Sequence, residues 1–470
     1  MNDKENIIRR AEATIAAVAT PAGTGGIAVV RVSGADALDV VARCWRGLPP
    51  ASMTSHTAHL GEVVDGDGNA VDQVVLTVFR APRSYTGEDT VELSCHGSPW
   101  VQRRVLEVLT AAGARQATRG EFTRRAFLTG RMDLSQAEAV ADLTAAESAA
   151  AARVALNQLR GAFAGRLRDL HDRLVHFVAL LELELDFSEE DVTFADRDRL
   201  LQLADEMDGE IAALAATFAD GNAIRRGVPL AIAGATNAGK STLLNALTGD
   251  DRAIVSDVHG TTRDTIEETL TVGGTLLRLT DTAGLRDTAD AVEALGIERS
   301  LRAVDRARVV LWVIDATAPA TVADLATVLL PRCAGKTLLV IINKTDLAAA
   351  DAVRERLATL ALPEGTVVVE MSARREADVE RLRREVERVA VPRVALDADT
   401  VVVTNARHHE ALTRALEALR RGRKALRDGV SAEFVAQDLR EVMAHIGSIT
   451  GTITTDAVLH DIFDNFCIGK

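Results

Sequence analysis

The stretch VPLAIAGATNAGKSTLLNAL, residues 228–247, decides the fold of the central part of this chain. An apolar run typical of a buried parallel strand leads into a loop with glycines, and the loop leads into the helical pattern LLNAL. From Gly234 to Ser241 the loop has the GxxxxGK[ST] spacing, in which backbone N–H groups turn toward a phosphate. The pattern predicts a phosphate site where Lys240 reaches the outer phosphates and Ser241 offers its hydroxyl to magnesium.

Two downstream motifs supply the other groups that a nucleotide–magnesium site needs. DTAG, residues 281–284, follows the apolar run TLLRL. Asp281 would stand near magnesium, and a glycine N–H of this motif would meet the terminal phosphate. Thr262, in HGTTRD, lies between the phosphate loop and DTAG, where the hydroxyl of a switch loop would complete the magnesium shell. Ser241 and Thr262 are therefore the predicted magnesium ligands.

Two more motifs point to guanine as the base. NKTD, residues 343–346, ends another apolar run, and Asp346 can accept both guanine donors, N1–H and the 2-amino group. Adenine lacks that donor pair. SAR, residues 372–374, supplies a backbone amide for the guanine oxygen. The ordered set predicts GTP, bound by Asn237, Ala238, Gly239, Lys240, Ser241, Thr242, Thr262, Asp281, Thr282, Ala283, Gly284, Asn343, Lys344, Asp346, Ser372, Ala373 and Arg374.

The residue after DTAG is Leu285, where GTPases of the Ras type carry a glutamine that orients the attacking water. Leucine cannot do this, so hydrolysis needs another polar group. The acidic residues just downstream are candidates, although most of them are expected to be solvated charge: Asp287, Asp290, Glu293 and Glu298. The transition state also needs positive charge, which Arg263, Arg286 or a monovalent cation held by Asn237 could supply.

Composition bounds the remaining functions. The chain has 470 residues, which favours about three domains, and its 47% apolar and 26% charged residues are typical of a globular protein. A net charge of −14 disfavours non-specific binding of nucleic acid, so any such contact must be local. The four cysteines have neither disulfide nor zinc spacing, and no window of 18 apolar residues occurs. We expect a cytoplasmic protein without a membrane span.

The texture of the sequence changes along the chain, and we expect a multidomain protein of α+β and α/β class. A compact α+β domain occupies residues 1–131. Helical sequence follows over 132–226, opening at DLSQAE with the Ser135-x-x-Glu138 form of a capping box. Residues 227–393 alternate strands and helices, as in a doubly wound GTPase domain. Residues 394–470 are helical again, so the economical interpretation is one helical domain interrupted by the GTPase domain.

Several blocks resemble the MnmE (TrmE) family of tRNA modification GTPases over almost the full length. They are GATNAGKSTLLNAL, AIVSDVHGTTRDT, DTAGLRDTADAVEALGIERS, SYTGEDTVELSCHG, GEFTRRAFLTGRMDLSQAEAVADL and the terminal FCIGK. The resemblance implies a homodimer with an amino-terminal domain for dimerisation and folate binding, a helical domain and an inserted GTPase domain. It also implies a flavin-dependent partner, GidA/MnmG, with which the family adds a carboxymethylaminomethyl-type group to carbon 5 of the wobble uridine of certain tRNAs. The one-carbon donor would be 5-formyl- or methylene-tetrahydrofolate.

The resemblance also implies roles for single residues. Asn237, Ser256, Val258 and Thr261 would bind potassium in place of an arginine finger, and Ser256 and Thr261 would also belong to the GTP site. Glu293 would orient the hydrolytic water, with Asp281, Lys240 and Cys467 as the other candidate catalytic residues. The folate pocket would include Arg31, Glu92, Arg131 and Lys470. Thr236 departs from the family, which has proline at this position.

Each assignment in the amino-terminal domain has a simpler alternative. Arg31 would otherwise be a solvent-facing strand residue. Cys95 and His96 resemble a nucleophile and base, but adjacent strand residues point to opposite faces. The basic stretch Arg119, Arg124, Arg125 and Arg131 could be a solvated face or a contact to tRNA phosphates. Near the carboxyl terminus, a second basic stretch has the same two interpretations, and we favour the solvated face for it: Arg420, Arg421, Arg423, Lys424 and Arg427.

Two other functions remain open from the residues. The GTPase motifs alone also fit a regulatory or ribosome-assembly switch without modifying activity, which would need no folate pocket. A folate-dependent one-carbon transferase in which GTP is only structural is the second alternative.

Overall fold

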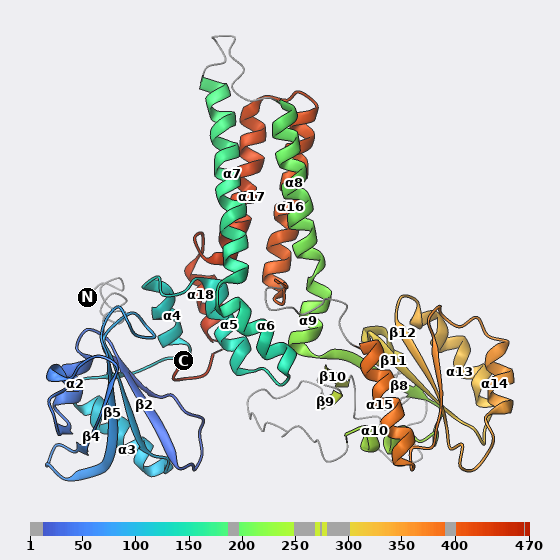
Figure 1. Cartoon of the computed structure of the whole chain (residues 1–470), viewed down its shortest axis with the longest axis horizontal. Helices are drawn as coiled ribbons and strands as arrows, with labels where there is room; N and C mark the ends of the chain where they lie inside the picture. The colour runs from blue at the N-terminus through green and yellow to red at the C-terminus, as the bar shows by residue number, and fades with distance from the viewer. Residues whose placement is uncertain are drawn as a thin grey trace. The chain divides into compact units, whose positions relative to one another are not determined.

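The computed structural model describes residues 13–186, 197–248, 268–272, 275–279, 301–390, 401–464 and 466–470. The chain divides into two compact units. One comprises Met1–Ala141, Gln158–Leu201 and Arg421–Lys470, and the other comprises Asp142–Asn157 and Gln202–Arg420. The mixed α+β and α/β class is confirmed (Figure 1). The bounds of the four predicted segments stay a prediction.

The first unit contains a seven-stranded sheet in the order β3-β4-β5-β6-β2-β1-β7. The sheet is antiparallel except for the β1–β7 pair. Alternation sets its two faces: in β2, Ala28, Val30 and Val32 are buried, whereas Arg31 lies on the other side. The strands are β1 Ile15–Val18, β2 Ile27–Ser33, β3 Trp45–Arg46, β4 Thr57–Val64, β5 Ala70–Phe79, β6 Thr90–His96 and β7 Arg115–Gln116.

Helices α2 (Ala37–Ala42) and α3 (Pro99–Ala111) cover the buried face of this sheet. A short 3-10 helix, Pro50–Ser52, precedes β4. Helix α4 (Glu121–Leu128) lies beside the carboxyl terminus of the chain: a Cβ on Gly120 would come within 2.6 Å of the Phe463 carbonyl. Ile468 forms an antiparallel bridge with Arg119. The last residues therefore belong to the amino-terminal domain, next to β1.

The helical sequence of the first unit forms α5 (Leu134–Thr144), α7 (Ala162–Asp186), α17 (Ala432–Thr450) and α18 (Asp456–Asp464), and α7 and α17 run side by side (Figure 1). The predicted capping box is wrong by two residues. The Asp133 carboxylate accepts a hydrogen bond from the Gln136 N–H at 3.0 Å, and the Gln136 side chain accepts one from the Asp133 N–H at 3.0 Å. Asp133 is therefore the cap, because its carboxylate meets a free N–H of the first turn, whereas Ser135 is already helical.

Helix α9 (Phe218–Arg226) lies in the second unit. Three further helices lie in it for most of their length: α6 (Ala149–Leu159), α8 (Arg197–Ala216) and α16 (Ala406–Arg427). Two arginines of the basic run at the end of α16 form ion pairs with acidic residues of their own unit. Arg420 contacts Asp208 at 2.7 Å, and Arg421 contacts Glu441 at 2.6 Å. These pairings support the interpretation of this run as a solvated face rather than a phosphate contact. No helix in the described ranges is both long enough and apolar enough to cross a membrane.

The second unit also contains a six-stranded sheet in the order β13-β12-β11-β8-β10-β9, parallel except for β9. Helices α10 and α15 pack on one face and α13 and α14 on the other, so β11 is buried at every residue. This arrangement confirms the doubly wound domain. Its elements are β8 Val228–Gly234, α10 Lys240–Thr248, β9 Glu268–Val272, β10 Thr275–Leu279, β11 Val309–Asp315, α13 Thr321–Leu329, the 3-10 helix Leu330–Cys333, β12 Thr337–Asn343, α14 Asp351–Ala358, β13 Val367–Glu370 and α15 Glu376–Ala390.

Because β8, β11 and β12 are parallel neighbours, their carboxyl ends meet at one edge of the sheet. The residues at these ends are Gly234, Asp315 and Asn343. Ligands of doubly wound sheets bind at this edge. The fold therefore gathers the predicted phosphate loop and the NKTD motif on one side of the domain.

Candidate functional site

The phosphate loop has a backbone that few side chains permit. Gly239 has a φ of 95°, and a Cβ at this position would come within 2.3 Å of Asn343 Nδ2. At Gly234 a Cβ would lie 2.3 Å from the Val313 carbonyl oxygen. Asn237 adopts a left-handed φ of 61° and is exposed. The two glycines allow close approach, so the loop curls into the cradle of backbone amides that a phosphate requires.

Lys240 opens helix α10, and its ammonium group folds over the loop that precedes it. The Nζ atom donates hydrogen bonds to the carbonyl oxygens of Gly234 at 2.9 Å and Ala235 at 2.8 Å. Burial lowers the pKa of this lysine, because a charged group loses water there. Anionic phosphate oxygens would compensate for that loss. Ser241 and Thr242 follow on the first turn of α10 and are exposed.

Asn343 ties the phosphate loop to the SAR loop. Its Nδ2 atom donates to the Ala238 carbonyl at 2.9 Å, and its Oδ1 atom accepts from the Ala373 N–H at 3.0 Å. The side chain is 2% exposed, so these two bonds fix three loops in one arrangement. The structure thus brings together the phosphate loop, NKTD and Ser372–Arg374, as the sequence predicted.

Asp346 is exposed and close to Ser372. A hydrogen bond from Ser372 and the charges of Arg375 and Arg374 lower the pKa of this carboxyl group, so it is ionised at neutral pH. The Ser372 N–H in turn donates to Asp378 Oδ2 at 3.0 Å. An ionised carboxylate at this position can accept two donors from the edge of a planar base.

Part of the predicted GTP and metal site lies outside the described residues. This applies to Ser256, Val258, Thr261, Thr262, Asp281, Thr282, Ala283, Gly284 and Glu293. The described part fits the phosphate and base ends of a nucleotide, and it contains Ser241 and Asn237 as possible ligands of magnesium and potassium.

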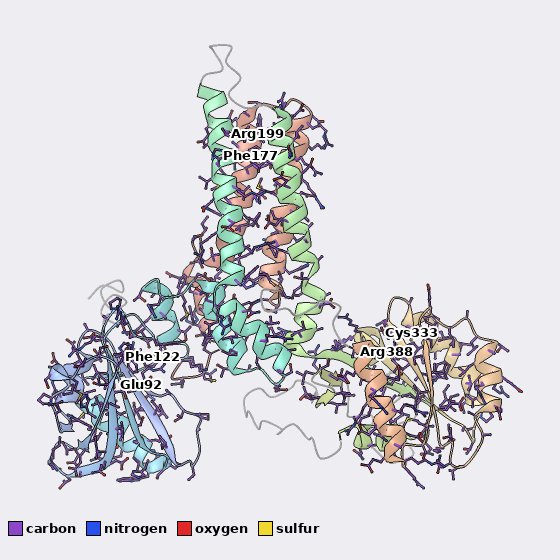
Figure 2. All side chains as sticks on the ribbon, in the orientation of Figure 1. Glu92, Phe122, Phe177, Arg199, Cys333 and Arg388 are labelled. Carbon is purple, nitrogen blue, oxygen red and sulfur yellow. The ribbon has the colours of Figure 1, made fainter. Side chains whose placement is uncertain are left out.

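A second group of charged residues gathers in the amino-terminal domain. Arg31 on β2 and Glu92 on β6 are register partners, and both Nε and Nη2 of Arg31 donate to Glu92 Oε1 at 2.8 Å. The guanidinium lies 5.0 Å from the Tyr85 ring centroid and 5.6 Å from that of Phe122. The Arg31 side chain is only 18% exposed, so the simple solvent-facing alternative is wrong. Figure 2 labels Glu92 and Phe122 in this domain.

The carboxyl terminus completes this group. Gly469 packs against β1, the strand next to Arg31 on β2: a Cβ on Gly469 would lie 2.3 Å from the Val18 carbonyl oxygen. Burial lowers the pKa of Lys470, the charge of Cys467 opposes this, and the charge of Arg31 lowers the pKa further. Cys467 is exposed. Arg131 is exposed and donates from Nε to the carbonyl oxygen of Ser84 at 3.2 Å. Arg31, Glu92 and Lys470 are thus brought together, and Arg131 contacts the residue next to Tyr85.

Sequence reasoning missed Tyr85 and Phe122. Tyr85 is the only tyrosine of the chain, and its hydroxyl is 2.8 Å from Thr123 Oγ1 on α4. Burial raises the pKa of this phenol. The position of Tyr85 inside the SYTGEDTVE block was the available signal. Phe122 offered none, because a phenylalanine in a helix is normally part of a core.

Burial decides the roles of two further candidates, the Cys95–His96 pair and Arg125. Cys95 is buried with its pKa raised to about 11, whereas His96 is exposed and bonds Asp72 through Nδ1 at 2.7 Å. They face opposite sides of the sheet, as expected, and do not form a catalytic pair. Arg125 is buried and bonds Glu88 at 3.0 Å and Glu121 at 3.2 Å. It is therefore a structural residue and not a tRNA contact.

Comparisons with known proteins agree with this organisation. A family model described as "MnmE helical domain" matches residues 134–467, and one described as "GTP-binding protein TrmE N-terminus" matches residues 14–131. Relatives called "tRNA modification GTPase MnmE" come from Parabacteroides distasonis and Porphyromonas gingivalis. The Parabacteroides protein is 46% identical over 97% of this chain and 100% of its own length. The Porphyromonas protein is 47% identical over 97% of this chain and 98% of its own length. A crystal structure of Era from Aquifex aeolicus, bound to GDP and aluminium fluoride, is 26% identical over 40% of this chain and 65% of its own, with a TM-score of 0.27.

Proposed function

Because the chain belongs to the MnmE family of tRNA modification GTPases, we propose that it works as a homodimer with a flavin-dependent partner of the GidA/MnmG type. Together they would add a carboxymethylaminomethyl-type group to carbon 5 of the wobble uridine in certain tRNAs. The reaction would take place in the cytoplasm, with a tetrahydrofolate derivative supplying the one-carbon unit. GTP hydrolysis by this chain would drive or time the modification.

The observation that carries the GTPase part is the Asn343 clamp. It holds the phosphate loop through Ala238 and the base loop through Ala373, with bonds of 2.9 and 3.0 Å. The clamp tolerates only glycine at position 239, because a Cβ there would lie 2.3 Å from Asn343 Nδ2. It thus joins the loop that precedes Lys240 to the loop that follows Met371, next to the NKTD motif that contains Asp346. The residues present fit GTP.

The metal part of the proposal adds residues beyond the described ranges. Ser241 and Thr262 would hold magnesium, near Asp281, and magnesium would neutralise charge on the phosphates. Asn237, Ser256, Val258 and Thr261 would hold potassium, which would supply the positive charge that an arginine supplies in other GTPases. Asn237 fits this role, since it is exposed on the phosphate loop at a φ of 61°. Glu293 would orient the attacking water.

The folate part rests on the Arg31 group. A reduced folate has a pterin ring with a donor edge at one end and glutamate carboxylates at the other. Glu92 is an acceptor for the donor edge, and Lys470 and Arg131 are cations for carboxylates. The rings of Tyr85 and Phe122, with centroids 5.0 and 5.6 Å from the Arg31 guanidinium, give the group apolar walls. Cys467 lies three residues before Lys470 and could contribute a thiol, which is exposed.

Hydrolysis can be tested by two changes. Replacing potassium by sodium should slow GTP hydrolysis strongly, and equal rates in both salts would remove the cation from the proposal. Glu293→Ala should lower the rate constant of hydrolysis by roughly two to four orders of magnitude while GDP still binds, which is the usual size for loss of a water-orienting group. Loss of binding together with rate would assign Glu293 a structural role instead.

Mass analysis of wobble uridines in tRNA from cells that lack this chain tests the modification itself. The carboxymethylaminomethyl-type group should disappear and return on complementation. Unchanged uridines, together with no heat of binding for 5-formyltetrahydrofolate, would favour the ribosome-assembly or regulatory switch. Modification that persists when the Asp281 and Glu293 side chains are removed would favour a one-carbon transferase with structural GTP.

A further inference from the structure

Lys344 has a carboxylate partner that lies outside every nucleotide motif. Its Nζ atom is 2.6 Å from Asp315 Oδ2, and Asp315 is 9% exposed. Asp315 is the last residue of β11, and it stands opposite Asn343 in the register of the parallel strands β11 and β12. Lys344 is the next residue after Asn343. The pair therefore sits at the sheet edge where the base loop begins.

The Asp315 carboxylate is itself held in place. Its Oδ1 atom accepts hydrogen bonds from the N–H of Thr317 at 2.9 Å and from the hydroxyl of Thr317 at 2.7 Å. Burial alone would raise the pKa of this group, but the bonds from Lys344 and Thr317 outweigh burial and lower the pKa. One carboxylate oxygen is thus committed to its own loop, and the other is committed to the lysine.

Lys344 is fixed at its backbone as well. Its φ is 63°, a left-handed conformation that is strained for a residue with a side chain. The bonds of Asn343 on one side, and the bond of the Thr345 N–H to the Met371 carbonyl at 3.2 Å on the other, hold this turn. With the backbone and the ammonium both anchored, the four methylene groups between them have little freedom.

We propose that Asp315 is a positioning residue of the guanine site. It anchors the Lys344 ammonium so that the methylene stem forms a fixed apolar wall beside Asp346, against which a purine ring packs. The wall contacts the face of the ring and not its edge, so it strengthens binding without reading the base. The inference rests on the guanine site proposed above and adds a residue to it.

Stability alone gives a weak account of the pair. The pair is only partly buried, with side chains 29% and 12% exposed, and such an ion pair contributes little net free energy because the loss of hydration offsets most of the attraction. The pair spans 29 residues of sequence, and it joins two strands whose backbones are already paired along seven register positions. What it adds is the orientation of one side chain next to Asp346.

A double-mutant cycle tests the proposal, read by the dissociation constant of fluorescently labelled GDP. Asp315→Asn should weaken GDP binding about tenfold, mostly through faster dissociation. In a Lys344→Ala background the same substitution should change binding less than twofold. IDP, which lacks the 2-amino group, should lose the same factor as GDP.

Three results would overturn the inference: equal costs of Asp315→Asn with and without Lys344, no change in GDP affinity, or different factors for GDP and IDP. Asp305→Asn is the matched control, because Asp305 forms an exposed ion pair with Arg332 at 2.5 Å in the same domain. This control should leave GDP binding unchanged. Absence of GDP binding in the wild-type protein would instead contradict the guanine site itself.

Thr317→Val keeps the proposal testable if Asp315→Asn does not fold. It removes only the hydroxyl bond to Asp315 Oδ1. GDP binding should weaken about twofold to threefold, and the effect should again vanish in the Lys344→Ala background. The same loss in both backgrounds would contradict the positioning role.

Discussion

The nucleotide site and the Arg31 group are built by opposite means. The first is a backbone cradle, in which Gly234 and Gly239 allow close approach and one side chain, Asn343, holds the loops. The second is a set of side chains, in which Arg31 pairs with a strand neighbour 61 residues away. A backbone cradle depends on a few adjacent residues, whereas a side-chain site depends on the fold that brings its members together. The two should therefore respond differently to substitution.

The largest expected effect comes from Asp346, the side chain that we propose selects the base. Asp346→Asn should leave the phosphate cradle intact but shift preference from guanine to xanthine nucleotides, because the xanthine 2-oxo group needs a donor. Loss of two charge-assisted bonds predicts a roughly thousandfold change in the ratio of GDP to XDP affinity. Competition binding with both nucleotides measures it. An unchanged preference would refute the guanine assignment.

Gly239→Ala should weaken GDP binding about a hundredfold. The new Cβ would lie 2.3 Å from Asn343 Nδ2, and the backbone φ of 95° strains any residue with a side chain. Gly335→Ala is the matched control, since Gly335 has a φ of 72° and a Cβ added there would meet no atom within 4 Å. If the two substitutions weaken GDP binding equally, the loss would come from a side chain at a positive φ and not from the clash with Asn343.

Arg31→Met should weaken 5-formyltetrahydrofolate binding about tenfold and leave GTP hydrolysis unchanged. The substitution keeps apolar volume beside the rings of Tyr85 and Phe122, but it removes both 2.8 Å bonds to Glu92. Arg46→Met is the control, because it removes an exposed ion pair with Glu62, 2.9 Å long, from the same sheet. Calorimetry should show no effect of the control, and loss of folate affinity in both variants would make the Arg31 effect non-specific.

The smallest expected effect is a shift in the pH at which Tyr85, the buried phenol beside Arg31, loses its proton. Burial raises the pKa of Tyr85, so the folded protein should form tyrosinate at a higher pH than the unfolded chain. The unfolded state loses this proton first, and the contribution of Tyr85 to stability is therefore lost as the pH rises above its ordinary value of 10.0. Ultraviolet absorbance measures tyrosinate directly, and Tyr85→Phe supplies the blank. Titration at the same pH in folded and urea-unfolded protein would contradict burial of the ring.

The sequence by itself determined the doubly wound domain, the phosphate loop and the base motifs. A strand, a glycine loop and a helix lie within 20 consecutive residues here, so local periodicity and backbone freedom specify them together. The same locality explains the missed capping box: Asp133 and Ser135 are both acceptable caps, and only the actual start of α5 separates them.

Tertiary structure decided what distant side chains do. It paired Arg31 with Glu92, brought Lys470 into reach of that arginine, placed Tyr85 and Phe122 beside it, and turned Arg125 inward. It also gave Lys344 its partner Asp315. None of these contacts follows from spacing, because strand order and register determine which faces meet. Charge and polarity are properties of a residue, but burial and partnership are properties of the packed chain.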